Sequence, residues 1–394
     1  MLHIPLRTPD PSIELYNPLL APSAVHVRLA AACNLSCEFC ERASWKSGDK
    51  APEKDCTPEV WDAVKAKYIP WVLGVELAGL GEPTLAKLFP IAASDTVAAG
   101  KTLYFPTNGY YLSTPQVLDS VGETPRVSIS LDAWDAESYK RVRGGDWDLV
   151  MNSVRTFARE KPNAVLHSQF TAGTYNIDGL PQFVQVCAGL GIKDVLMRFV
   201  QAHTVAREDV SLRFAQDRTE AAIEAARSVA EREGIMFIAE RRPYATYKPN
   251  SAHEQSPTDR LARYLDFVPF GAGLVQTTNC NAPTTTIRSI TVGSIVNNFE
   301  PFSSTSVPKV LRRLVATPSV SPDDRRVDYS PAAMVVAWDG ELWSCFAGHV
   351  IGNALTTSME DVILNPRYQT FLQNRQSSAT LPLETWCQHC ARCY

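Results

Sequence analysis

Apolar and polar positions alternate along residues 24–30 (AVHVRLA), where Val25, Val27 and Leu29 share one face. This pattern is typical of a strand with one buried face. Similar runs predict five more strands, at 72–78, 102–105, 126–131, 165–171 and 194–200. Helical spacing lies between them, near 57–68, 84–99, 114–121, 135–159, 178–190 and 217–233. Because the strands alternate with helices, we expect parallel pairing in a βαβ chain.

Six such repeats are two short of a closed eightfold barrel, and an open, partial barrel would have a wide lateral mouth. Residues 1–23 predict an irregular arm, and the proline-bearing, polar stretch 241–279 predicts a bridge. Within the remaining domain, 280–394, the run Pro331–Trp343 predicts two short strands around a turn at Asp339 and Gly340. A helix is expected from Ser358 to Gln373.

The composition describes an ordinary globular chain. With 394 residues, 45% hydrophobic, the chain can bury one large core and a smaller one. A net charge of −4 argues against a broad nucleic-acid or anionic-membrane surface. The start carries no signal sequence and no apolar run reaches membrane-span length. Most of the ten cysteines gather in two groups near the ends, which favours metal chemistry in a reducing cytoplasm.

Three cysteines lie within eight residues directly after the first strand: Cys33, Cys37 and Cys40, spaced C-x3-C-x2-C. A cubane iron–sulfur cluster takes thiolate ligands, and such a loop can hold three of its four corners. The fourth iron would then be open to another ligand. Structural zinc is the first alternative, although it usually takes four ligands from paired C-x2-C hooks. Disulfide pairing is the second, although three cysteines cannot all pair.

In this loop the chain resembles the radical S-adenosylmethionine (radical SAM) superfamily, whose signature is this spacing with an aromatic residue before the third cysteine, here Phe39. The resemblance implies an α/β fold, a partial (β/α)6 TIM-like barrel, over about residues 24–240. It implies a 4Fe–4S cluster whose open iron chelates S-adenosylmethionine (SAM). It also implies reductive cleavage of SAM to a 5′-deoxyadenosyl radical, with a flavodoxin- or ferredoxin-type electron donor.

Polar residues follow the predicted strands at the end where parallel barrels carry their active sites. Gly81 and Glu82 belong to a glycine-rich turn that matches the superfamily's glycine–glutamate motif, although Pro83 could simply end the strand. For Asp132 the alternative is a cap on the next turn, and for Arg143 it is a solvated helix end. The residues expected to contact the cofactor are Phe39, Gly81, Glu82, Asn108, Ser130, Asp132, Arg143 and Arg198.

Two other cysteines lie in the part of the chain that predicts the barrel. Cys187 keeps helical spacing with Leu180, Phe183 and Val184, which favours a core position. Cys56 directly precedes a helix start, and helix N-termini lower thiol pKa values. Cys56 is therefore a candidate hydrogen-atom donor.

The end of the chain is the second cysteine group. Its spacing, with an Asp-Gly hairpin, a helix and a terminal C-x2-C, resembles the SPASM and twitch domains, which add auxiliary iron–sulfur clusters to radical SAM barrels. A full SPASM domain has seven cysteines, whereas this chain offers five, so we expect one auxiliary 4Fe–4S cluster. Structural zinc remains the alternative. The preferred ligands are Cys280, Cys345, Cys387 and Cys390, with Cys393 competing for the place of Cys387.

The resemblance favours a maturase that oxidises, crosslinks or epimerises a ribosomal peptide. A radical epimerase or dehydrogenase of a carbohydrate- or aminoglycoside-type natural product is the alternative. The short stretch before Ala24 leaves little room for a folded domain that would bind a leader peptide. This weakens the preference for the peptide maturase over the carbohydrate enzyme. A zinc- or cluster-bearing binding protein without catalysis is the alternative from another class.

Overall fold

The computed structural model describes residues 22, 24–37, 39–40, 42, 54–72, 74–200, 208–212, 214–239, 333–344 and 350–368. Within these ranges, ten strands form one sheet in the order β10-β9-β8-β1-β2-β3-β4-β5-β6-β7. The barrel strands are β1 Ala24–Ala30, β2 Gly74–Gly79, β3 Thr102–Thr107, β4 Arg126–Ser130, β5 Val165–Ala172, β6 Asp194–Phe199 and β7 Met236–Ala239. Each of them pairs in parallel with the next.

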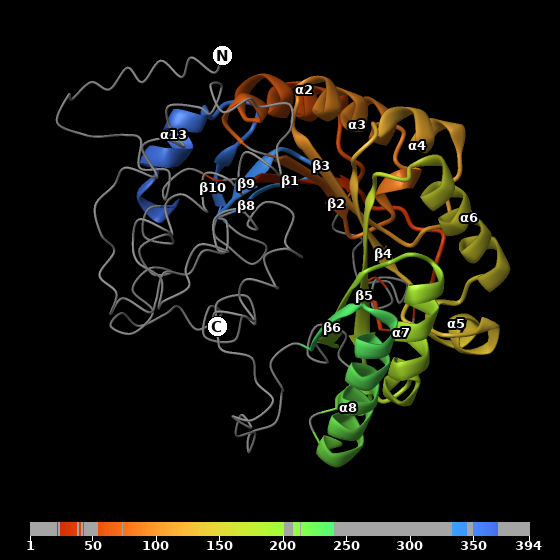
Figure 1. Ribbon diagram of the computed structural model, residues 1–394. Helices are drawn as coiled ribbons and strands as arrows, with labels where there is room; N and C mark the ends of the chain where they lie inside the picture. The colour runs from red at the N-terminus through yellow and green to blue at the C-terminus, as the bar shows by residue number, and fades with distance from the viewer. Residues whose placement is uncertain are drawn as a thin grey trace, which may run out of the picture.

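All six predicted strands are present, and they confirm the expected partial (β/α)6 TIM-like barrel. The short seventh strand, β7, was not predicted. Helices follow the strands and lie along the outer side of the curved sheet (Figure 1). They are α2 Pro58–Lys67, α3 Phe89–Ala98, α4 Pro115–Ser120, α5 Ala136–Arg143, α6 Trp147–Glu160, α7 Leu180–Gly189 and α8 Gln216–Glu233. Short 3-10 turns are η1 Ile69–Trp71, η2 Pro83–Leu85, η3 Ile177–Gly179 and η4 Glu208–Val210.

The main core lies between the sheet and these helices. Val25, Val27 and Leu29, the apolar face predicted for the first strand, are all fully buried in it. Burying one such side chain stabilises the fold by about 1.5–3 kcal/mol. The core therefore fixes the direction in which each barrel strand ends.

The single helix predicted over 135–159 is wrong, because the structure has two helices there. Gly144 ends α5 with a φ of 72°, a left-handed conformation that glycine adopts without strain. Asp146 then begins α6, and its side chain accepts a hydrogen bond from the Leu149 amide. The break turns the end of α5 back toward the cysteine loop, since a Cβ on Gly144 would lie 2.8 Å from the Ser36 hydroxyl oxygen.

The C-terminal elements extend the barrel sheet. They are β8 Ala333–Val336, β9 Glu341–Trp343, β10 Val350–Asn353 and α13 Met359–Leu364. The predicted hairpin is confirmed as the antiparallel pair β8–β9. β8 also pairs in parallel with β1, from Ala24 opposite Ala333 to Val27 opposite Val336.

Contacts from α2 hold the C-terminal elements in place. Lys67 Nζ donates to the carbonyl oxygens of Ala354 and Leu355, at 2.8 Å each. The Tyr68 hydroxyl donates to the Thr357 carbonyl oxygen at 2.6 Å. The predicted helix does begin after Ser358, which caps it, but the single helix predicted to Gln373 is wrong, because α13 ends at Leu364. Asn365 is extended, as is usual for the residue before a proline. Residues 369–373 lie outside the described ranges. None of the helices in the described ranges is long and apolar enough to cross a membrane.

Candidate functional site

The cysteine loop leaves the carboxyl end of β1 and lies directly against the turn that follows β2. A Cβ on Gly79 would come within 2.2 Å of the Ala30 carbonyl oxygen, and a Cβ on Gly81 within 2.2 Å of the Ala32 carbonyl oxygen. The Gly81 amide donates to Ala30 at 2.9 Å, and the Glu82 amide donates to Ala32 at 2.8 Å. The two glycines are therefore required for the close approach of one backbone to another, which places the chain just before Cys33.

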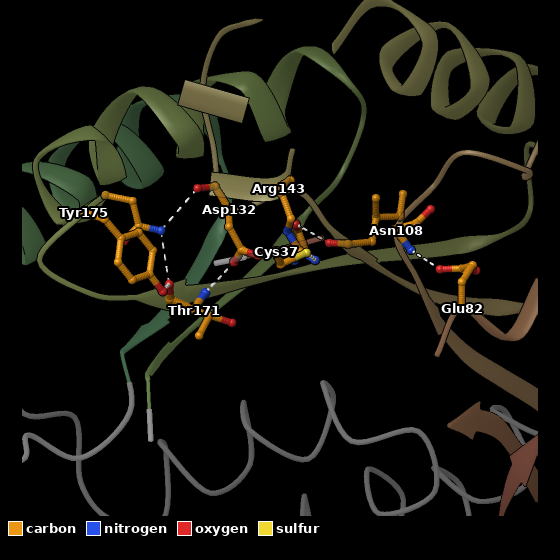
Figure 2. Close-up of polar contacts among 10 residues, drawn as sticks. Cys37, Glu82, Asn108, Asp132, Arg143, Thr171 and Tyr175 are labelled. Atoms are coloured by element: carbon orange, nitrogen blue, oxygen red, sulfur yellow. Dashed lines mark hydrogen bonds and ion pairs between the residues drawn. The ribbon is translucent and has the colours of Figure 1, made fainter. Parts of the chain in front are cut away.

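The Glu82 side chain is buried and joins two loops. Its carboxylate accepts hydrogen bonds from the hydroxyls of Thr84 and Thr107, both at 2.6 Å, and from the Asn108 amide at 2.7 Å (Figure 2 shows the last of these). The Thr84 amide is a fourth donor, at 3.2 Å. Burial raises the pKa of Glu82, and these donors oppose that shift. The carboxylate thus fastens the turn after β2 to the turn after β3.

Asn108 continues this network toward the cysteines. Its side-chain amide donates to the Asn34 side-chain oxygen at 2.8 Å and to Cys33 Sγ at 3.8 Å. Its own side-chain oxygen accepts from the Tyr110 amide at 3.1 Å. Asn108 therefore fixes the start of the cysteine loop.

Asp132 stands at the end of β4 and is fully buried. It is the one non-glycine residue in the described ranges with a positive φ, 54°. Its carboxylate accepts from the Arg143 guanidinium and, at 2.5 Å, from the Thr171 amide, while its backbone carbonyl accepts from the Asn176 side chain at 3.2 Å. The alternative of a simple cap is wrong, because the cap of the next helix is Asp135.

Arg143 is the last residue of α5 and points into the site, as Figure 2 shows. One Nη donates to Asp132 and the other donates to Cys37 Sγ at 3.4 Å. Burial alone would lower the pKa of this guanidinium, but Asp132 and Cys37 raise it above its usual value, so the group is a permanent cation. The alternative of a solvated helix end is wrong, because Arg143 is only 8% exposed.

Phe39 covers the guanidinium. The Arg143 guanidinium carbon lies 5.2 Å from the centre of the Phe39 ring, and the opposing Tyr175 ring stacks on Phe39 with centres 5.6 Å apart. Both rings also pack against Val200 and Val210. The aromatic residue of the cysteine motif therefore shields the ion pair from water.

The sulfur atoms of the loop accept hydrogen bonds from three sides. Cys33 Sγ accepts from the Leu35 amide at 3.5 Å as well as from Asn108, and Cys37 Sγ accepts from Arg143. Arg143 Nε is buried with no hydrogen-bond partner in the described ranges, which leaves one further donor pointing into this environment. N–H donors around thiolate sulfur are a common feature of iron–sulfur sites, and they tune the potential. The residues present therefore fit a cluster.

Comparisons with known proteins agree with this geometry. The family model of the radical SAM superfamily matches residues 27–184, and the model of the SPASM iron–sulfur cluster-binding domain matches residues 331–394. The chain belongs to the radical SAM superfamily. SAM and a 4Fe–4S cluster are the cofactors typical of that superfamily, and the C-terminal match marks an auxiliary cluster domain.

The curated relatives of this radical SAM enzyme have different substrates. GTP 3′,8-cyclase of Alkaliphilus oremlandii is 26% identical over 182 residues, 45% of this chain and 55% of that protein. Mycofactocin maturase MftC of Mycolicibacterium smegmatis is 29% identical over 179 residues, 43% of each chain. The enzyme thus spans about half the length of the curated relatives it matches.

Solved structures share the fold of the enzyme over almost its whole length. Streptococcus suis SuiB bound to its precursor peptide SuiA has a TM-score of 0.54 at 14% identity, covering 95% of this chain and 70% of that one. The enzyme anSMEcpe with bound AdoMet has a TM-score of 0.54 at 13% identity, covering 94% and 83%. Both confirm the architecture of a barrel followed by a C-terminal domain.

The cysteine loop does not gather its side chains around a single ion. In the described part of the chain, no three His, Cys, Asp or Glu side chains gather closely enough to hold a single metal ion. A cubane distributes its thiolates over separate irons, so it does not need them around one ion. Cys37 is buried, and Cys33 and Cys40 are half-buried.

The remaining predicted site residues of the enzyme lie at varying depths. Ser130, the last residue of β4, is half-buried opposite Gln169, and Arg198 on β6 is half-buried opposite Thr171. Cys187 is fully buried in the core, as expected. The five C-terminal cysteines, Cys280, Cys345, Cys387, Cys390 and Cys393, lie outside the described residues.

The expected low pKa of Cys56 is wrong. Its thiol is buried in the core beneath β1 and donates to the Thr57 carbonyl oxygen at 3.6 Å. Burial, reinforced by the neighbouring Asp55 charge, raises its pKa to about 12. Proximity to a helix terminus is outweighed by desolvation here. Its role as a hydrogen-atom donor stays a prediction.

The residues of the network that the sequence did not predict include Thr84, Thr107, Thr171 and Asn176. The signal for Thr107 was available, since it directly precedes Asn108 in the turn after β3. Thr171 acts through its backbone amide, which other residue types would also supply, whereas Asn176 acts through its side-chain amide at a position that no motif in the sequence marks.

A separate groove of about 560 Å³ opens beside the cysteine loop, between Asn34, Leu35 and the junction of α5 and α6. Tyr110, Lys140 and Trp147 line its other walls. The loop that carries Cys33 and Cys37 is therefore close to the protein surface on this side.

Proposed function

We propose that this enzyme is a peptide-modifying maturase that oxidises, crosslinks or epimerises a ribosomal peptide. The observation that supports it best is the pairing of a radical SAM barrel with a SPASM domain in one fold that follows SuiB, a protein solved with a precursor peptide, over 95% of this chain. The similarity of MftC, itself named a maturase, points the same way. GTP 3′,8-cyclase matches about the same length of chain, so the barrel sequence alone does not select the substrate.

The residues proposed for the cofactors lie at the carboxyl rim of the barrel. Cys33, Cys37 and Cys40 hold the cluster, which together with SAM supplies a 5′-deoxyadenosyl radical that takes a hydrogen atom from the substrate. The SAM pocket is proposed to involve Phe39, Gly81, Glu82, Asn108, Ser130, Asp132 and Arg198. Arg143, also expected there from the sequence, lies between Asp132 and Cys37. Within the pocket, Glu82 and Asn108 act by fixing the loops, because their polar atoms already bond to protein groups.

We further propose one auxiliary cluster, held by Cys280, Cys345, Cys387 and Cys390. A cube with four thiolates is fully ligated, and five thiols are on offer. Such a cluster would accept the electron left after hydrogen abstraction, and a flavodoxin or ferredoxin would supply the electron for the first. Mössbauer iron counting on single-cysteine variants tests the assignment. About eight irons outside the first site, or a cluster lost with Cys393→Ala and kept with Cys387→Ala, would contradict it.

The substrate is tested by following hydrogen transfer. Anaerobically reconstituted enzyme with SAM and dithionite is given, separately, deuterated short peptides encoded beside its gene, deuterated aminocyclitols and sugars, and deuterated GTP. Deuterium should appear in 5′-deoxyadenosine only with a peptide, and the peptide mass should change. Transfer from a carbohydrate or from GTP alone would overturn the peptide assignment.

The matched control is the variant in which Cys33, Cys37 and Cys40 are all alanine. It should form no 5′-deoxyadenosine with any compound, while the iron of the C-terminal domain stays in place. If its iron content equals that of the wild type, the three cysteines are not the ligands of the first cluster.

A further inference from the structure

We propose that Arg143 is a positioning residue for the cluster rather than a SAM ligand: it holds a permanent positive charge against Cys37 and thereby raises the reduction potential of the barrel cluster. The inference rests on the proposed ligation by Cys33, Cys37 and Cys40. It concerns a helix-end residue that the sequence suggested only as a fork for a carboxylate of the cofactor.

The geometry divides the guanidinium between two protein acceptors. One Nη donates to Cys37 Sγ at 3.4 Å and the other to the Asp132 carboxylate. Cys37 is buried, and Asp132 is held by the Thr171 amide at 2.5 Å and by the Asn176 contact to its backbone. Each terminal nitrogen of the fork thus already donates one hydrogen bond to a protein acceptor before a cofactor binds.

The surroundings strengthen this charge. Arg143 is 8% exposed, and its open face is covered by Phe39, which in turn stacks on Tyr175. Water is excluded on that side, so the charge acts through a low dielectric. Reduction adds one electron to the cluster, and a cation that donates an N–H bond to a ligand sulfur stabilises the more negative state.

Asp132 acts in the opposite direction. It is the counter-ion of the buried arginine, and it accepts from the terminal nitrogen that does not donate to Cys37. Its negative charge disfavours the reduced cluster. The two residues therefore predict potential shifts of opposite sign, which no purely structural role would produce.

The test is the midpoint potential of the barrel cluster, measured without SAM by an EPR-monitored redox titration of the full-length, reconstituted protein. The signal of the barrel cluster is the part that the Cys33, Cys37 and Cys40 triple-alanine variant lacks. The variants are Arg143→Met, Arg143→Lys and Asp132→Asn. Arg141→Met is the matched control, because Arg141 lies on the same helix, carries the same charge and is exposed.

We expect the midpoint to fall in Arg143→Met, to fall less in Arg143→Lys, which keeps the charge but cannot fork onto both acceptors, and to rise in Asp132→Asn. Arg141→Met should match the wild type. If Arg143→Met does not assemble a cluster, the lysine and asparagine variants still decide by the opposite signs of their shifts. An Arg143 variant with the wild-type midpoint but weaker SAM binding would overturn the proposal and make Arg143 a SAM ligand. A wild-type protein that binds no cluster on the three cysteines would instead contradict the proposed function.

Discussion

Two buried acidic side chains, Glu82 and Asp132, lie at the same rim of the barrel and have different kinds of partners. Glu82 is surrounded by uncharged donors, two threonine hydroxyls and two backbone amides, from the turns after β2 and β3. Asp132 is paired with a guanidinium and one amide, from α5 and β5. The first arrangement fixes loops without placing a compensating charge in the site. The second delivers a cation to the Cys37 sulfur, so with the proposed cluster in place it would influence electron transfer as well as shape.

The largest effect should follow the loss of the charged partner. Asp132→Ala leaves the Arg143 cation buried without a counter-ion, which costs about 3–5 kcal/mol of unfolding free energy. Urea denaturation of the cluster-free protein, followed by tryptophan fluorescence, measures this loss. Asp178→Ala is the control, because Asp178 is an exposed partner of Arg218 and its loss should cost below about 1 kcal/mol. Equal losses of unfolding free energy in the two variants would contradict a larger contribution from the buried pair.

A smaller loss is expected at the uncharged site. Glu82→Gln keeps the shape, but its amide N–H₂ faces donors such as the Asn108 amide and the Thr107 hydroxyl. Leaving one buried donor without an acceptor costs about 1–3 kcal/mol. The same urea titration at pH 7 applies, with the exposed Glu123→Gln as control. A stability loss above that of Asp132→Ala would reverse the order of the two sites.

Removing a single donor should cost less again. Thr107→Val keeps the volume of the side chain and deletes one of the four donors to Glu82, so we expect a loss of about 1 kcal/mol. Thr114→Val is a comparison, because the Thr114 hydroxyl donates to a local carbonyl, that of Tyr111, and has no contact with Glu82. In Glu82→Gln the further effect of Thr107→Val should shrink, since the two residues share one interaction. Full additivity in the double variant would contradict the network.

The smallest effect is a dependence on pH. Burial raises the pKa of Glu82 above its usual 4.5, so the folded protein holds this proton more tightly than the unfolded chain. The corresponding stability is fully present below the unfolded pKa and is lost as pH rises through the folded one. Gln does not titrate. The difference in unfolding free energy between wild type and Glu82→Gln should therefore narrow as pH rises above 4.5. A difference that widens would mean that the pKa of Glu82 is lowered in the folded protein, not raised.

The barrel was predictable from local patterns in the sequence. The alternation of Val25, Val27 and Leu29 located the first strand, and Thr57 with Pro58 located the start of α2. The helix over 135–159 was misjudged because a stop at Gly144 and a cap at Asp146 lie within one continuous apolar pattern. The sequence contains both a continuous apolar pattern and the signals for a break. Which of the two prevails depends on tertiary contacts of the turn.

The site was predictable as a set of residues and not as a set of contacts. Cys37, Asp132 and Arg143 were each selected, yet the bond from Arg143 to Cys37 joins α5 to a loop that follows β1. Pairings over such separations leave no periodicity. Burial is likewise invisible in the sequence at Cys56. The helix terminus that would lower the thiol pKa can be read from the sequence, but the desolvation that raises the pKa cannot.

The pairing of β8 with β1 has a consequence for synthesis and folding. On the ribosome, β1 is made long before its neighbour, and until Ala333–Val336 emerge, one edge of the barrel sheet lacks the partner it has in the finished fold. Unpaired edges invite association with other chains, and contacts between distant parts of a chain form slowly. A nascent chain halted between the two strands would therefore hold the cysteine loop on the side of an incomplete sheet. Chaperone occupancy is expected to persist until the C-terminal hairpin docks.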